Sequence, residues 1–328
     1  MNTITQNVGS IVEQMLAGHL DEEEIIDALT SLEDHRFTGT ELAQAATIMR
    51  KAAVPMTLEG CPMDTCGTGG SGLARINTST LVAFVVAAAG GTVAKHGNRS
   101  SGGRCGSFDV LEGLGAHINL TADQAKRIYD RLGIVFLFAP QFHPAMRNVA
   151  AARKRYGKRT IFNLLGPLCH PAGVKRQLIG TPNGETAALI AEALQELHTE
   201  RSMVVSGKDG LDEVTVCGET EVYDSASEKK NIFAHAFHPE NFGIPLYAPS
   251  SITGGDVQTN VDIAKDILSN ASSPAHRDLV IVNAAHALLL TDLVTDLPAA
   301  ISLARETLSS GKAQRLMERY IAITHTIS

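Results

Sequence analysis

Residues 64–72 are the first group whose types and spacing could do chemistry. They read DTCGTGGSG, with four glycines among nine residues. Glycine lets a ligand approach the peptide plane and adopts backbone angles that other residues avoid, so this loop can surround an anion. A helix that begins in NTST, residues 77–80, would direct its positive end and free N–H groups toward the glycines, as in phosphate sites. For a glycine run alone, a tight turn between a strand and a helix is the alternative.

A second polar cluster, KHGNR at residues 95–99, follows the apolar run LVAFVVAAAG and a short strand-like segment. Lys95 is a compact cation suited to phosphate oxygens, and Asn98 can both donate and accept hydrogen bonds to a sugar or an aromatic substrate. An isolated lysine is more often solvent-exposed, but its place after an apolar strand favours a binding role. His96 has two interpretations: a buried histidine with satisfied hydrogen bonds, or a residue that lines a ligand site.

Two adjacent carboxylates, Asp212 and Glu213, lie in DGLDEV after the strand-like SMVVSG. The end of such a strand would project them to the carboxyl edge of a sheet, where open α/β sheets bind ligands. Paired carboxylates next to a diphosphate suit Mg²⁺, a hard cation that takes oxygen ligands. An acidic turn without a ligand is the alternative for any such pair.

These groups need elements that bring them together. Residues 8–54 show apolar faces at helical spacing, and the pairs Thr38 with Glu41 and Thr121 with Gln124 each predict a helix-capping box. From residue 64 short β-rich segments alternate with helical ones, which is typical of βαβ units with right-handed crossovers. Helical patterns return from residue 257 to the end.

We therefore predict an α/β protein with a small helical domain plus a larger α/β domain around a central, mostly parallel sheet. The helical N-terminal domain covers residues 1–62, and a later segment near residues 160–185 returns to it. The α/β domain, residues 63–328, would bind the phosphorylated ligand. We expect the site in the cleft between the two, a common place for ligands.

The composition narrows the class of protein. A formal net charge of −7 at pH 7, without a block of like charge, argues against nucleic acid as a partner. The five cysteines lack CxxC spacing, which favours a reducing compartment over a disulfide framework or a structural zinc site. The N-terminus lacks the pattern of a signal peptide, and no apolar run is long enough to span a membrane. We expect a cytoplasmic protein without a membrane partner.

Several motifs stand in order between residues 66 and 214: CGTGG, NTST, AKHGNR, FAPQFHPAMRNV, RTIFNLLGPL and DGLDEV. Together they closely resemble the anthranilate phosphoribosyltransferases, tryptophan-pathway members of the nucleoside phosphorylase fold group. The resemblance implies Mg²⁺-dependent transfer of a phosphoribosyl group from 5-phosphoribosyl-1-pyrophosphate to anthranilate, giving N-(5-phosphoribosyl)anthranilate and pyrophosphate. It also implies a homodimer formed through the helical domain.

The resemblance further implies which residues act. The donor would be bound by Gly67, Thr68, Gly69, Gly70, Ser71, Asn77, Ser79, Thr80, Lys95 and Arg104. The acceptor would be bound by Gly67, His96, Asn98, Arg153 and Gly166, with the planar guanidinium of Arg153 on the substrate carboxylate. The metal ligands would be Asp212, Glu213 and Ser79. No residue is expected to act as covalent nucleophile or general base, because a neutral aromatic amine is itself nucleophilic and the main task is electrostatic.

The chain departs from the resembled pattern at three places. Ser71 stands where aspartate is usual, and residues 102–106 read GGRCG in place of a serine-rich loop. Cys169 and His170 stand where threonine and asparagine are common. These changes keep open a second hypothesis, a paralogue with the same donor and another aromatic or heterocyclic acceptor.

Two further alternatives fit less well. A pyrimidine nucleoside phosphorylase would share the fold, but the KHGNR and RTIFNLLGPL segments suit it poorly. A noncatalytic ligand-binding relative would be expected to lose charged site residues early. This chain keeps Lys95, Asn98, Arg153, Asp212 and Glu213.

Overall fold

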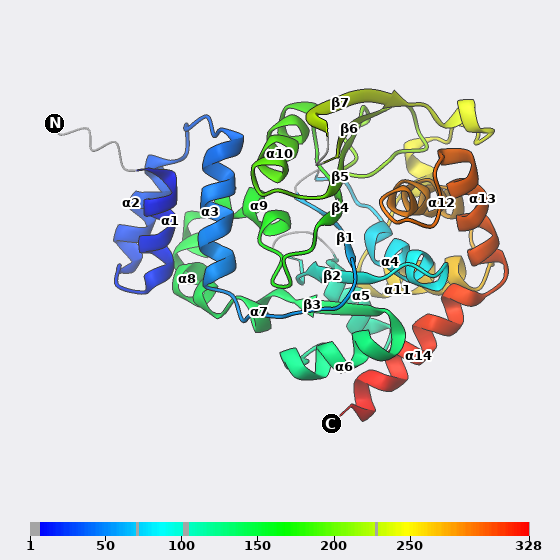
Figure 1. Cartoon of the computed structure of the whole chain (residues 1–328), viewed down its shortest axis with the longest axis horizontal. Coiled ribbons are helices and arrows are strands. Elements are labelled where there is room, and N and C mark those ends of the chain that lie inside the picture. Colours follow the sequence, from blue (N-terminus) through cyan, green and yellow to red (C-terminus); the bar gives the residue numbers. More distant parts are fainter. Residues whose placement is uncertain (1–6, 70–71, 101–104, 227–228, 328) are drawn as a thin grey trace.

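A single seven-stranded sheet forms the centre of the protein, with helices on both faces and a group of helices beside it (Figure 1). The computed structural model describes residues 7–69, 72–100, 105–226 and 229–327. The strands are β1 (Met63–Gly67), β2 (Val93–Gly97), β3 (Ile134–Phe138), β4 (Arg176–Gly180), β5 (Arg201–Gly207), β6 (Thr220–Ala226) and β7 (Lys229–Phe237).

The strand order is β3-β2-β1-β4-β5-β6-β7. The strands from β3 to β5 pair in parallel, and β6 and β7 add an antiparallel edge. Strand β3 is buried at every position, as expected where helices cover both faces of a parallel sheet. The predicted α/β class with a central, mostly parallel sheet is confirmed.

Helices make up most of the remaining chain. The α-helices are α1 (Val8–Ala17), α2 (Glu22–Ser31), α3 (Gly39–Lys51), α4 (Thr78–Ala88), α5 (Ser107–Gly113), α6 (Ala122–Leu132), α7 (Ala139–Phe142), α8 (Arg147–Tyr156), α9 (Ile161–Leu165), α10 (Gly184–Glu196), α11 (Val257–Leu268), α12 (Pro274–Leu289), α13 (Leu297–Ser309) and α14 (Lys312–Thr326). Short 3₁₀ helices are η1 (Pro144–Met146), η2 (Gly166–Leu168), η3 (Pro239–Phe242) and η4 (Pro249–Ile252). Among the described residues, no helix combines the length and apolar character needed to cross a membrane.

Both predicted capping boxes are confirmed. At the start of α3, the Thr38 hydroxyl accepts a hydrogen bond from the Glu41 N–H at 3.2 Å, and the Glu41 carboxylate accepts one from the Thr38 N–H at 2.9 Å. Thr121 and Gln124 make the same reciprocal pair at the start of α6. Each box pairs two N–H groups that the first helical turn would otherwise leave free.

The apolar interior falls into two clusters. The larger one surrounds α4, which packs between the sheet and helices α12, α13 and α14. The smaller one joins α1 and α3 to α8, α9 and α10 beside the sheet (Figure 1). The chain therefore returns to the N-terminal helices at α8, before residue 160, and residues 176–180 of the predicted return segment belong to the sheet as β4. The division into domains at residue 62 stays a prediction.

His286 makes the stability of the larger core depend on pH. It lies on α12, is 2% exposed and donates a hydrogen bond from Nδ1 to the Val282 carbonyl at 2.8 Å. Burial lowers its pKa to about 4, although the bond to Val282 opposes the shift, and His235 adds to it. An unfolded histidine binds its proton near pH 6.5, so the unfolded chain gains protons first as the pH falls. The free energy of unfolding therefore falls between pH 6.5 and about 4.

We expect His286→Leu to weaken this pH dependence. Between pH 7 and pH 5 the wild-type protein should lose about 2 kcal/mol more unfolding free energy than the variant. Urea unfolding followed by circular dichroism at both pH values measures this difference. His19 is exposed, so His19→Leu is the matched control and should retain the wild-type response. An unchanged response in His286→Leu would contradict the interpretation.

Candidate active site

The carboxyl ends of three neighbouring strands bring the predicted motifs to one edge of the sheet. Strands β1 and β4 end together because Gly67 pairs in register with Gly180, and β2 ends beside them at Gly97. The glycine loop follows β1, and α4 begins at Thr78 with Asn77 at its N-cap. The described residues from 64 to 69 and from 72 to 80 thus contain a strand end and a helix start at the edge where parallel sheets bind ligands.

The loop that carries Asp212 folds back onto these strand ends. A Cβ atom on Gly180 would lie 1.7 Å from the Asp212 carbonyl oxygen, and one on Gly67 would lie 3.1 Å from Oδ2 of Asp212. Position 180 therefore requires a residue without a side chain. The Val214 N–H donates to Oδ1 of Asn283 on α12 at 2.9 Å, which anchors the loop. The acidic pair is held over the same edge as the glycine loop.

Opposite charges meet in this buried region. Asp212 is 0% exposed, and its carboxylate is in direct contact with the guanidinium of Arg75. Burial raises the pKa of Glu213 to about 7, although the positive charges of Arg75 and Lys95 oppose that rise. Sequence reasoning missed Arg75, because a basic residue in a loop is usually solvated and only its nearness to the glycine run set it apart.

Lys95 points into the protein and is only 2% exposed. Its Nζ donates a hydrogen bond to the Thr65 carbonyl of β1 at 2.6 Å. The neighbouring His96 N–H donates to Oδ1 of Asp64 at 3.1 Å. A solvent-exposed position for this lysine is thereby excluded, and its charge lies beneath the end of β1. Its contact with the donor stays a prediction.

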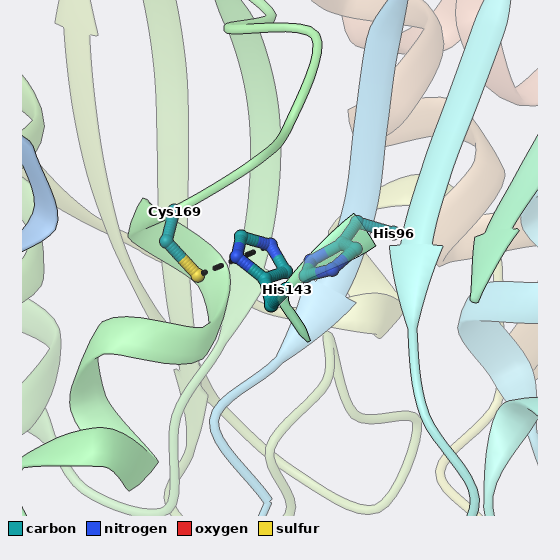
Figure 2. Close-up of side chains that lie close together, drawn as sticks. All are labelled: His96, His143 and Cys169. Carbon is teal, nitrogen blue, oxygen red and sulfur yellow. Dashed lines mark hydrogen bonds between the residues drawn. The ribbon is translucent and has the colours of Figure 1, made fainter. Parts of the chain in front are cut away.

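Three side chains gather beside the end of β2 (Figure 2). They are His96 on β2, His143 between α7 and η1, and Cys169 after η2. The ring centroids of His96 and His143 are 5.0 Å apart, and Sγ of Cys169 lies 3.9 Å from Nε2 of His143. Burial lowers the pKa of His143 to about 4 and that of His96 well below its usual value. Both rings are therefore neutral near pH 7.

His170 forms the adjoining wall of this histidine group. Its Nε2 donates to the Ala94 carbonyl at 2.7 Å, and its Nδ1 accepts from the Ala172 N–H at 3.1 Å. By contrast, Nε2 of His96 is buried and has no hydrogen-bond partner in the described part of the chain. The Gly166 backbone lies close enough to raise the pKa of His96, against the larger effect of burial, and the role of His96 stays a prediction. Sequence reasoning did not assign His143 to the site, although the FHPAM motif contains it.

The predicted acceptor residues lie near this group. Arg153 on α8 is half-buried, with its Cζ 5.2 Å from the ring centre of Phe162, and makes no ion pair within the ranges that the structure describes. A Cβ atom on Gly166 would meet no atom within 4 Å, so this face of the backbone is open. The Gly166 carbonyl accepts from Sγ of Cys169 at 3.3 Å, which links it to the histidine group. Asn98 is exposed at the end of the KHGNR cluster.

The predicted donor residues are distributed around the start of α4. Asn77 occupies the N-cap position without a side-chain cap, and its Oδ1 instead accepts from Asn260 Nδ2 at 3.0 Å. Ser79 is half-buried and Thr80 fully buried in the first turn of the helix. Arg159, which sequence reasoning missed, donates to the Gly69 carbonyl at 2.9 Å. The predicted residues Gly70, Ser71 and Arg104 lie outside the described residues.

Comparison with known proteins decides the family. Residues 59–314 match the family described as "Glycosyl transferase family, a/b domain". The anthranilate phosphoribosyltransferase of Herpetosiphon aurantiacus is 40% identical over 315 residues, which cover 96% of this chain and 93% of that protein. The chain belongs to the anthranilate phosphoribosyltransferase family. The resemblance inferred from the sequence motifs is confirmed.

Solved structures of anthranilate phosphoribosyltransferases share the fold. The enzyme from Thermus thermophilus has a TM-score of 0.90 at 37% identity, covering 97% of this chain and 94% of its own. The Saccharomyces cerevisiae enzyme in complex with PRPP and Mg has a TM-score of 0.88 at 26% identity, covering 97% and 93%. Another structure of the yeast enzyme contains 4-fluoroanthranilate.

The acidic pair has the donor atoms that a hard cation requires. Both carboxylates are buried, with Glu213 9% exposed. Oδ2 of Asp212 has no hydrogen-bond partner among the described residues, so contact with Arg75 leaves one carboxylate oxygen for a cation. Mg²⁺ takes oxygen ligands and is commonly bound by one or two carboxylates together with substrate phosphates. These residues fit that ion.

Replacing both carboxylates by amides, Asp212→Asn with Glu213→Gln, should abolish metal-dependent turnover. We expect a loss of about 1,000-fold or more, because a bound metal contributes several kcal/mol of charge stabilisation. Turnover measured during a Mg²⁺ titration tests this. Glu219 is an exposed acid of the same connection, so Glu219→Gln should leave the titration unchanged. Wild-type turnover in the double variant would exclude these residues as ligands.

Proposed function

We propose that the protein transfers the phosphoribosyl group of 5-phosphoribosyl-1-pyrophosphate to anthranilate in tryptophan biosynthesis. The products are N-(5-phosphoribosyl)anthranilate and pyrophosphate. Family membership supports this activity, and related yeast structures contain PRPP with Mg and 4-fluoroanthranilate. The single observation that carries the proposal is the meeting of the glycine loop, the start of α4 and the Asp212–Glu213 pair at one sheet edge.

In the part of the site that binds the donor, the main effect is electrostatic stabilisation of the diphosphate. N–H groups of the glycine loop and of the first turn of α4 bind the diphosphate, which the positive end of the helix also favours. Arg75 and Lys95 add positive charge beneath the loop. Asp212 and Glu213 would hold Mg²⁺, which would supply positive charge to neutralise the departing diphosphate. Because these groups are fixed before the reaction, little reorganisation is needed when charge develops at the leaving oxygen.

In the part of the site that binds the acceptor, the residues orient the aromatic acid toward the donor. Arg153 binds the carboxylate of the aromatic acid, since no protein carboxylate competes for it within the described residues. The open backbone face of Gly166 accommodates the ring. The neutral imidazole of His96 lines the same side without repelling the positive charge that grows on the sugar. The amine attacks as the neutral base, so no side chain has to remove its proton beforehand.

The proposal also covers the domains of the protein, its assembly into a dimer and its location in the cell. Residues 1–62 with the helical part of the return segment near residues 160–185 form a helical domain, and the rest of residues 63–328, including strand β4, forms the donor-binding domain. The helical domain joins two copies into a homodimer, and the protein acts in the cytoplasm. Family membership supports these statements together with the helical cluster of α1, α3, α8, α9 and α10.

An assay with a panel of acceptors tests the function. Purified protein with 5-phosphoribosyl-1-pyrophosphate and Mg²⁺ should consume anthranilate, which is followed by the loss of its fluorescence. Turnover of another aromatic or heterocyclic acid in place of anthranilate would favour the paralogue hypothesis. No turnover across the panel, with binding of the donor retained, would favour a noncatalytic ligand-binding protein.

Arg153→Ala should raise the KM for anthranilate by about 10- to 100-fold, because hydrogen bonds to a charged group contribute about 1.5–3 kcal/mol. The KM for the donor should change little, since the guanidinium lies on the acceptor side. Steady-state kinetics with each substrate varied in turn separates the two. Lys154 is exposed on the same helix, so Lys154→Ala is the control. Equal effects on both substrates would count against the carboxylate role.

A further inference from the structure

His96, His143 and Cys169 form a compact group of metal-binding side chains that the proposed mechanism does not use as such. Each offers one ligand atom, and these atoms all lie within 4.8 Å of one another. The three residues come from three separate segments, and Figure 2 shows the His143 ring between the Cys169 sulfur and the His96 ring. The tertiary fold brings them together, so the lack of CxxC spacing in the sequence does not argue against a metal site here.

One distance within the group is close to that between two ligands of a bound ion. Zinc binds histidine nitrogen at about 2.0–2.1 Å and cysteine sulfur at about 2.3 Å, in tetrahedral geometry. Two ligand atoms of such a site are therefore about 3.3–3.7 Å apart, by that geometry. Sγ of Cys169 and Nε2 of His143 are 3.9 Å apart. The three ligand atoms lie within 4.8 Å of one another, so the side chains must move closer together to hold an ion.

The group is also buried and incompletely hydrogen-bonded. The exposed fractions are 7% for His96, 5% for His143 and 2% for Cys169. Nε2 of His96 is buried with no hydrogen-bond partner in the described ranges, which is costly for a polar atom unless a ligand pairs with it. A neutral imidazole nitrogen of this kind is the form that binds a metal.

We propose that His96, His143 and Cys169 bind one divalent ion of the zinc class, with a fourth position left open. On binding, the Cys169 thiol gives its proton to solvent and the sulfur–metal bond replaces the bond from Sγ to the Gly166 carbonyl. Imidazole and thiolate select zinc-class ions over Mg²⁺, whereas the Asp212–Glu213 pair offers only oxygen. The two sites therefore differ in the metal that each prefers.

Neighbouring groups support the three ligands. The Asp64 carboxylate accepts a hydrogen bond from the backbone N–H of His96 at 3.1 Å, which fixes the main chain at this residue, and its Oδ2 is buried without a partner among the described residues. Burial lowers the pKa of His170, Asp64 opposes the shift, and Arg50 and Lys95 add to it, so charges of both signs lie near the group. His170 has both ring nitrogens paired, so it packs beside the group and is not a ligand.

A cobalt titration tests the proposal without any assay of activity. The full-length protein is freed of metal with a chelator, kept reduced, and titrated with Co²⁺, whose bond to a thiolate gives a near-ultraviolet charge-transfer band. We expect this band to saturate at one equivalent and to be displaced by Zn²⁺. Cys169→Ser should abolish it. His143→Gln should raise the dissociation constant by more than about 100-fold, because even changes to residues behind the ligands cost about 10- to 100-fold in affinity.

Two control variants assign the band to this site. Cys66 packs against the same apolar cluster, so Cys66→Ser should keep the band. Asp212→Asn should also keep it, because the acidic pair holds no sulfur. Circular dichroism melting shows whether each variant is folded. A wild-type protein without the band, or a folded Cys169→Ser or His143→Gln variant with unchanged binding, would overturn the proposal.

Occupation of the site has a consequence that rests on the proposed function. His96 is a predicted acceptor residue, so Zn²⁺ there should raise the KM for anthranilate at least about tenfold, with the donor's KM unchanged and Cys169→Ser relieving the effect. The cobalt titration reports binding whether or not the protein turns over anthranilate. A failure of the activity proposal is therefore distinguishable from a failure of the metal site.

Discussion

The close contact of the Asp212 loop with the ends of β1 and β4 is the constraint on which the rest of the site depends. A side chain at position 180 would overlap the Asp212 carbonyl, so the contact exists because Gly180 has none. Asn283 anchors the loop from the other side through Val214. Together these contacts hold two carboxylates above the edge where the glycine loop ends and α4 begins.

The electrostatics of the two halves follow from what burial does to each kind of group. In the donor half, buried acids are compensated by buried bases, as the direct contact of Asp212 with Arg75 shows. In the acceptor half, burial keeps the imidazoles of His96 and His143 neutral. A charged leaving group and a neutral attacking amine therefore meet surroundings suited to each. The same neutrality leaves imidazole nitrogens available to a zinc-class ion beside Cys169.

The sequence predicted the features that local pattern controls. The capping boxes at Thr38 and Thr121, the strand–loop–helix around residues 64–80 and the class of sheet are all confirmed. Features that depend on long-range packing were beyond it. Arg75, Arg159 and His143 gain their positions from segments far away in the chain, and helix α8 joins the N-terminal helices before the predicted return segment begins. Asn77 occupies the N-cap of α4, but its side chain has a distant partner, Asn260.

The central claim is that backbone N–H groups at the glycine loop and the start of α4, with a cation on two adjacent acids, stabilise a departing diphosphate. A crystal structure with 5-phosphoribosyl-1-pyrophosphate and Mg²⁺ tests it most directly. We expect diphosphate oxygens within hydrogen-bonding distance of N–H groups between residues 67 and 80, and Mg²⁺ on Asp212 and Glu213. A diphosphate remote from these residues, or a metal ion bound without either carboxylate, would contradict it.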